Sequence, residues 1–130
     1  MAVYTREESK NHVNEKDPAL IRFAVNKEMF IWIQPEEILF IQSADHYVKT
    51  LVRHENRKKW TIRHSTLKEI LPLLGNHNFI RLNKFYVINK NWVSHFDEEL
   101  KTIYLEDGFP IPLIHRISPF ILSMFRRSNE

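Results

Sequence analysis

The chain has 130 residues, the length of one ordinary domain, and its 43% hydrophobic and 12% aromatic residues are enough to form a core. Two glycines and no cysteine exclude glycine-rich phosphate loops, disulfide frameworks and thiolate metal sites. The net charge is +3, but residues 46–96 hold ten basic residues against two acidic ones, whereas residues 97–107 hold five acidic residues and one basic residue. This uneven distribution favours a polyanionic partner, although a solvated charged surface would give the same counts.

The first part of the sequence differs from the rest. Residues 1–17 are rich in charged residues and poor in apolar ones, so we expect a flexible N-terminal arm there and one folded domain over residues 18–130. The arm lacks the apolar run of a signal peptide, and no stretch approaches the roughly 18 apolar residues of a membrane span. A cytoplasmic protein that does not contact the membrane is therefore expected.

Short apolar stretches rich in β-branched and aromatic residues predict a mainly β fold. Turn-forming residues at 44–46, 54–56 and 106–108 separate neighbouring strands, and Gly108 can adopt the positive φ that a tight hairpin requires. Nine strands are expected, at residues 21–25, 29–33, 38–43, 47–52, 59–63, 85–88, 92–96, 100–105 and 109–113.

Two helices are predicted to interrupt the strands. Thr66 followed by Glu69 forms a capping-box pattern, and apolar residues at helical spacing continue to Gly75. Because Pro72 lies inside this pattern, the central helix is expected to be short or bent. Ser118 is a typical N-cap residue before a proline at the first helical position, which predicts a C-terminal helix.

The segment 78–89 is the most distinctive candidate for a binding site. Its apolar residues can anchor it while Arg81, Asn83 and Lys84 project outward. An amide can pair bidentately with adenine, and a lysine or arginine can contact guanine or a phosphate. The segment therefore predicts a contact with duplex DNA centred on Arg81 and Lys84, with a charged strand edge as the alternative interpretation.

Four segments, in the same order, resemble the LytTR-type DNA-binding domain of bacterial response regulators. Residues 79–89 resemble the family pattern F-x-R-x-H-R-S-Y-x-x-N, and residues 111–116 resemble I-P-x-S-R-R. Upstream, residues 38–48 resemble I-x-x-I-E-A-x-x-x-Y-V, and residues 65–70 resemble the short central helix of the family. The resemblance covers about residues 20–125.

The resemblance implies an elongated β fold of three short antiparallel sheets, with a short central helix and a C-terminal helix. It also implies a sequence-specific transcriptional regulator that inserts loops into the major groove of duplex DNA. Because the sequence shows no convergent nucleophile, base or metal set, we expect no enzymatic activity and no cofactor. The paired repeat sites of the family suggest a homodimer on DNA. Because Asn83, Lys84, Phe85 and Ile114 depart from the family pattern, we expect a different base sequence to be recognised.

The family's DNA contacts, carried over to this sequence, are three groups of base contacts and one set of phosphate contacts. The expected base contacts are His46, Tyr47, Asn83, Lys84, His115 and Arg116. The expected phosphate contacts are Lys49, Arg63, Arg81 and Lys90. The alternatives are a core position for Tyr47, a structural ion pair for Arg81 and simple solvent exposure for His115. Since 17 residues leave no room for a receiver domain, we expect a stand-alone regulator controlled by its expression level, another protein or a ligand.

Other classes of function have less support in the sequence. The histidines show no i, i+4 pair, which argues against a metal centre or an enzyme. RNA binding would require aromatic residues that alternate with basic ones on one sheet face, together with a recognition signature that is absent. The main alternative is a regulatory module on the same β scaffold that binds another protein. Trp32, Trp60 and Trp92 fit such a surface, although we expect them in the core.

Overall fold

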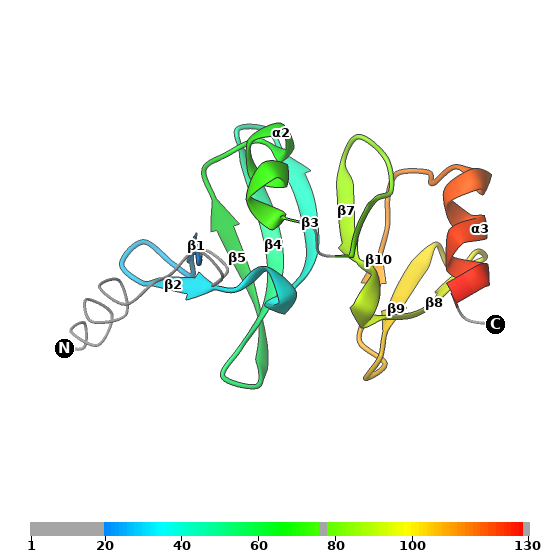
Figure 1. Ribbon diagram of the computed structural model, residues 1–130, viewed down its shortest axis with the longest axis horizontal. Coiled ribbons are helices and arrows are strands. Elements are labelled where there is room, and N and C mark those ends of the chain that lie inside the picture. The colour runs from blue at the N-terminus through cyan, green and yellow to red at the C-terminus, as the bar shows by residue number, and fades with distance from the viewer. Residues whose placement is uncertain (1–19, 76–77, 129–130) are drawn as a thin grey trace.

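The fold is elongated and mainly β, as Figure 1 shows for the computed structural model. The structure describes residues 20–75 and 78–128, so the predicted arm, residues 1–17, lies outside the described residues. The strands are β1 (Ile21–Ala24), β2 (Phe30–Ile33), β3 (Ile38–Ala44), β4 (Tyr47–His54), β5 (Arg57–Arg63), β6 (Phe79–Arg81), β7 (Tyr86–Asn89), β8 (Val93–Asp97), β9 (Thr102–Leu105) and β10 (Pro110–Pro112). The helices are η1 (Pro35–Glu37), α2 (Leu67–Ile70), η2 (Leu71–Leu74), η3 (Lys90–Trp92) and α3 (Pro119–Ser128).

The described strands form two antiparallel sheets. The larger sheet has seven strands in the order β2-β1-β5-β4-β3-β7-β6, and the smaller has three in the order β10-β9-β8. The expected mainly β, antiparallel class is confirmed, but the described residues form two sheets where three were expected. The reason is one pair of residues, Ala24 and Ile62, through which β1 joins the β1–β2 hairpin to the edge of β5.

The seven-stranded sheet buries side chains on both of its faces. On one face, Phe23 and Ile41 pack with Ile70 of the central helix. On the other, Phe40 and Tyr86 pack against the three-stranded sheet, where Ile103 is fully buried. Each such side chain contributes roughly 1.5–3 kcal/mol by burial, so these two cores fix the sheets and the loops that leave them.

Both predicted helix starts are confirmed. The Thr66 hydroxyl accepts a hydrogen bond from the Glu69 backbone N–H (3.1 Å), and the Glu69 carboxylate accepts one from the Thr66 N–H (2.8 Å). The α-helix then ends at Ile70 and continues as a 3₁₀ turn, because Pro72 has no N–H for an α-helical bond. At α3, the Ser118 hydroxyl accepts a bond from the Ile121 N–H (3.3 Å).

The strand predictions missed one element and ended one hairpin too early. Strand β6 has only three residues, so its alternation is too short to stand out, yet it pairs with β7 from Phe79 to Arg81. The β4–β5 hairpin continues to a two-residue turn, in which Glu55 and Asn56 adopt positive φ angles of 54° and 63°. Such a turn matches the twist of the two strands and lets both extend.

The expected core position of the tryptophans is wrong for two of them. Trp32 and Trp60 keep 38% and 39% of their surface exposed, because the three-stranded sheet covers the β3–β7 part of the larger sheet and leaves β5 and β2 uncovered. Trp92 is half-buried, and its indole N–H donates to the Glu36 carbonyl (2.9 Å). None of the described helices has the length and hydropathy needed to cross a lipid bilayer.

Candidate nucleic-acid interface

Three segments far apart in the sequence meet at one end of the strands, along the upper side of Figure 1. They are the β3–β4 turn (residues 45–47), the loop before β7 (residues 82–85) and the segment after β10 (residues 113–117). The Ser43 N–H donates to the Phe85 carbonyl (2.8 Å), which sets the first segment beside the second. We call these residues, together with the adjoining Arg81, the loop edge, and it contains all six expected base contacts.

Loop 82–85 is held by its own polar side chains. The Asn83 side-chain oxygen accepts hydrogen bonds from the backbone N–H groups of Phe85 (2.8 Å) and Tyr86 (3.0 Å). The Arg81 guanidinium donates to the carbonyls of Asn83 (3.0 Å) and Lys84 (3.2 Å). The Lys84 side chain remains exposed, with its ammonium 5.3 Å from the centre of the Phe85 ring. The loop therefore presents Lys84 from a backbone that is already ordered.

Segment 113–117 is attached to that loop. The buried Tyr86 hydroxyl accepts hydrogen bonds from the backbone N–H groups of Ile114 (3.0 Å) and His115 (3.2 Å). The Asn83 amide donates to the Arg116 carbonyl (3.0 Å). The His115 imidazole stacks on the Phe85 ring, with 3.8 Å between the ring centres and 18° between the planes. The Arg116 side chain is exposed, and the expected second and third contact groups are therefore brought together.

The β3–β4 turn presents the first contact group. Asp45 adopts a positive φ of 64°, which an aspartate tolerates better than most residues, and the two-residue turn leaves His46 exposed. Tyr47 is half-buried, with its ring centre 6.4 Å from that of His64. The core alternative for Tyr47 is therefore only partly met.

The four expected phosphate contacts have different positions. Arg81 lies at the loop edge, and Arg63, which pairs with Val48 at the same end of the strands, donates to the Arg22 carbonyl (3.0 Å). Lys49 is exposed on β4, 4.9 Å from the Trp60 ring centre. Lys90 follows the far end of β7, so about 14 Å of strand separates it from loop 82–85, and the structure does not bring it to the loop edge.

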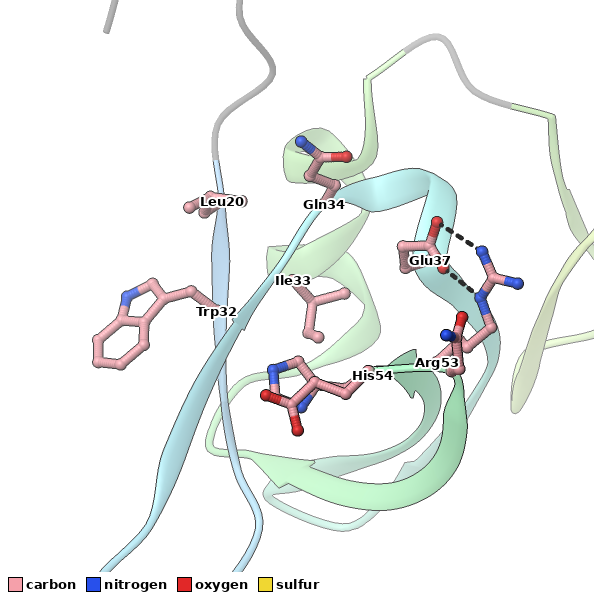
Figure 2. Close-up of a pocket in the computed structure, with 9 residues that line it drawn as sticks. Leu20, Trp32, Ile33, Gln34, Glu37, Arg53 and His54 are labelled. Carbon is pink, nitrogen blue, oxygen red and sulfur yellow. Dashed lines mark hydrogen bonds and ion pairs between the residues drawn. The ribbon is translucent and has the colours of Figure 1, made fainter. Parts of the chain in front are cut away.

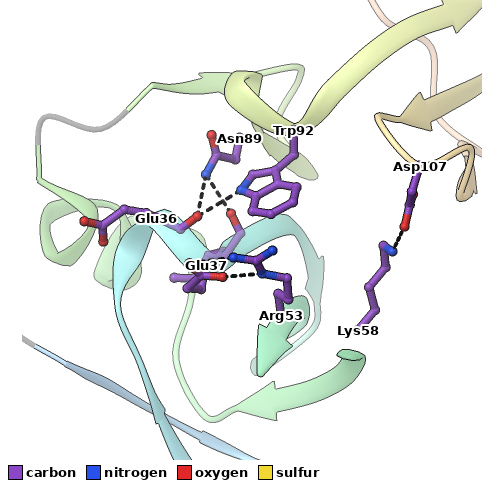
Figure 3. A network of polar contacts seen from close by, with 8 residues as sticks. Glu36, Glu37, Arg53, Lys58, Asn89, Trp92 and Asp107 are labelled. Carbon is purple, nitrogen blue, oxygen red and sulfur yellow. Dashed lines mark hydrogen bonds and ion pairs between the residues drawn. The ribbon is translucent and has the colours of Figure 1, made fainter. Parts of the chain in front are cut away.

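The far ends of β3, β4, β5 and β7 form an opposite edge with different electrostatics, shown in Figure 3. Here the Arg53 guanidinium pairs with the Glu37 carboxylate (2.7 Å), and Lys58 pairs with Asp107. The hydrogen bond to Glu37 raises the pKa of Arg53, and the hydrogen bond from Lys58 lowers the pKa of Asp107. Neither of these two ion pairs lies at the loop edge.

The opposite edge also contains an open hollow of about 410 Å³, shown in Figure 2. It is lined by Trp32, His54 and the Arg53–Glu37 pair. Within the described part of the chain, no group of three or more histidine, aspartate or glutamate residues could hold a metal ion. No such group lies among the residues that line the hollow.

The structural roles of Phe85 and Tyr86 and the position of Arg22 were not predicted from the sequence. Phe85 and Tyr86 belong to the segment that resembled the family pattern, so their importance was signalled although their partners were not. Arg22, which lines a small hollow with Arg63 and His64, lies next to them only through β1–β5 pairing. No local sequence signal indicates such a neighbour.

A comparison with protein families matches residues 28–118 to the LytTr DNA-binding domain. The chain belongs to this family. The matched region includes all three segments of the loop edge, and the resemblance inferred from the sequence is confirmed. This LytTr domain is therefore a DNA-binding domain.

Among solved structures, this LytTr domain is similar to the LytTr DNA-binding domain of a protein described as a methyl-accepting/DNA response regulator from Bacillus cereus. The two are 18% identical, the match covers 85% of this chain and 96% of the other, and the TM-score is 0.57. This likeness shows a shared fold. A search of curated proteins finds no match.

Proposed function

We propose that this LytTr domain is a sequence-specific, duplex-DNA-binding transcriptional regulator whose loop edge enters the major groove. The observation that carries the proposal is the convergence of exposed Lys84, His115, Arg116 and His46 at one edge, where no described carboxylate forms an ion pair with them. A cation without an acidic partner is available for phosphates and for the acceptor atoms of guanine. The family supports DNA as the partner.

The residues of the loop edge take different roles in this proposal. Lys84 and Arg116 are the principal base contacts, because both project from ordered backbone into solvent. His46, Tyr47 and His115 contact bases at the two ends of the edge, whereas Asn83 has one N–H left for DNA after its three bonds within the protein. Phosphate contacts are assigned to Lys49, Arg63 and Arg81, and Lys90 is left out because of its position.

Selection from random duplex DNA, followed by sequencing, tests this function. We expect a recovered motif, with two repeats if the protein binds as a homodimer, and an affinity that falls with salt. Three to four neutralised phosphates predict a slope of about −3 in a plot of log affinity against log salt concentration. The absence of any enriched sequence, or binding that does not depend on salt, would contradict the proposal.

A regulatory module that binds another protein is a second candidate, favoured by one observation. Phe30 and Trp32 on β2, with Trp60 and Ile62 on β5, leave about 40% of each side chain exposed on the same face of the larger sheet. Contiguous exposed apolar surface is typical of interaction sites. Replacing Phe30 and Trp32 by alanine should leave DNA affinity unchanged, because both residues lie on β2, outside the loop edge. A loss of DNA affinity in this variant would instead place the sheet face in the DNA interface.

A further inference from the structure

Residues 114–116 have no apolar anchor of their own. Strand β10 ends at Pro112, and the buried Leu113 and Ile117, each 6% exposed, hold the two ends of the segment. Between them all three side chains are exposed, and Ile114 reaches 81%. The conformation of this stretch therefore depends on contacts made by its backbone and by the His115 ring.

Those contacts come from Asn83 in the neighbouring loop, from Tyr86 at the start of β7 and from the Phe85 ring. Tyr86 uses both acceptor positions of its hydroxyl on the N–H groups of Ile114 and His115, and Asn83 donates to the Arg116 carbonyl. Phe85 contributes the stack with His115. The Asn83 side chain also accepts the two N–H bonds that shape loop 82–85, so a single residue orders both segments.

We propose that Asn83 and Tyr86 are positioning residues, which fix residues 114–116 on loop 82–85 so that Lys84, His115 and Arg116 meet DNA in a preset arrangement. The inference rests on the proposed function and extends it, because it makes sequence discrimination depend on residues that act through others. It also gives Asn83 a main role different from the base contact predicted from the sequence. Tyr86, which is 1% exposed, acts entirely from inside the protein.

A preset arrangement of the contact residues affects the choice between DNA sequences, which charge alone does not. Groups that are already ordered lose little conformational freedom on binding, so they favour the one DNA sequence that fits them. Non-specific binding depends mainly on charge and on phosphate contacts, which tolerate a mobile loop. Loosening residues 114–116 should therefore lower specific affinity and leave non-specific affinity and the salt slope unchanged.

Tyr86→Phe tests the first part of the inference in the free protein, because it removes only the hydroxyl. Amide hydrogen exchange followed by NMR should show exchange at Ile114 and His115 about tenfold faster, as expected for the loss of one hydrogen bond each. The matched control is Tyr104→Phe, since Tyr104 lies on β9 in the other sheet, away from the loop edge. Unchanged exchange at Ile114 and His115 would overturn the inference.

The second part compares binding to the duplex recovered by selection with binding to an unrelated duplex of equal length. Tyr86→Phe and Asn83→Ala should each lower affinity for the selected duplex about tenfold and change affinity for the unrelated duplex less than about twofold. Lys49→Met, at an assigned phosphate contact, should in contrast weaken binding to both duplexes and reduce the salt slope by about one. If the ratio of the affinities for the selected and the unrelated duplex stayed the same in the Tyr86→Phe and Asn83→Ala variants, the positioning role would be contradicted.

Two further results separate this inference from the proposed function. If the wild-type chain prefers no DNA sequence, the proposed function fails and so does the predicted effect on discrimination, whereas amide exchange still decides whether the contacts exist. If Tyr86→Phe does not fold, amide exchange at Phe85 and Tyr86 in the free Asn83→Ala protein decides the question, because the Asn83 side chain accepts both N–H bonds and lies outside the core. Unchanged exchange there would overturn the inference.

Discussion

The loop edge and the opposite edge of the larger sheet use the same kinds of side chain in opposite ways. At the opposite edge, Arg53 and Lys58 each pair with a carboxylate and lie over an aromatic ring, 4.6 Å from the centre of Trp92 and 5.3 Å from that of Phe109. At the loop edge, the guanidinium of Arg81 and the amide of Asn83 bind backbone carbonyls, and neither Lys84 nor Arg116 forms an ion pair with a described carboxylate. Basic residues at one edge hold the two sheets together, and those at the other are available to a polyanion.

The two sheets explain this division. Lys58 on β5 reaches Asp107 in the β9–β10 turn, so that ion pair links the larger sheet to the smaller one. The indole N–H of Trp92 adds a bond to the Glu36 carbonyl (2.9 Å) in the same region, as Figure 3 shows. An exposed ion pair contributes little to the free energy of unfolding. The two sheets are therefore held together at this edge by several such contacts and not by one of them alone.

The largest expected effect comes from placing an acid at the loop edge. Lys84→Glu removes a base contact and adds repulsion with phosphates, so affinity for the selected duplex should fall about 100-fold or more. Arg57→Glu makes the same charge change in the β4–β5 turn region at the opposite edge and should change affinity far less. Fluorescence anisotropy at fixed salt measures both. Equal losses in the two variants would show that net charge, and not position, governs binding.

A smaller change tests the role of Arg116 as a base contact. Arg116→Met should cost about 1–3 kcal/mol of specific binding and relax the preference at a single base position. Repeating the selection with this variant shows whether one position of the motif loses its preference. A uniform loss over all sequences would assign Arg116 to a phosphate instead.

Trp92→Phe, a substitution at the opposite edge, should lower the stability of the domain without changing its affinity for DNA. Trp92→Phe removes the bond to the Glu36 carbonyl, and we expect the free energy of unfolding to fall by about 1 kcal/mol. Urea denaturation measures this loss, and affinity for the selected duplex should stay within twofold of the wild type. A marked loss of DNA affinity would show that the two edges are coupled.

The smallest effect is a pH dependence of the Lys58–Asp107 pair. Lys58 lowers the pKa of Asp107 in the folded state, so the stabilisation is present above the ordinary aspartate pKa of about 3.9 and is lost as the pH falls through the lower folded value. Unfolding measured from about pH 5 downward should show a shallower decline for Asp107→Asn than for the wild type. Identical slopes in the two proteins would mean that the pair adds nothing. Glu106→Gln, at the neighbouring carboxylate, is the control.

Local patterns predicted the parts of this fold that depend on local chemistry. The capping box of Thr66 and Glu69, the helix start at Ser118 and the turn at Gly108 each rest on contacts within a few residues, and the structure contains all three. The joining of the β1–β2 hairpin to β5 depends on the pair of Ala24 with Ile62, 38 positions apart, which no periodicity indicates.

The location of the candidate site could be predicted from the sequence, but the role of each of its residues could be predicted only in part. The segments that resembled the family pattern do meet at one edge, but the sequence cannot tell which atoms a polar side chain will bind. Asn83 was expected to face bases, yet it bonds to a carbonyl 33 residues later in the chain. Lys90 was expected to contact a phosphate, but strand β7 carries it to the other edge, away from loop 82–85.

The central claim is that DNA binds at the loop edge and not elsewhere on the domain. Titration of ¹⁵N-labelled protein with the selected duplex, followed by NMR, tests it most directly. The account predicts that the backbone amides of residues 45–47, 82–85 and 113–117 shift, while those around Arg53 and Asp107 stay in place. Shifts concentrated at the opposite edge, or around Phe30 and Trp32 on β2, would contradict it.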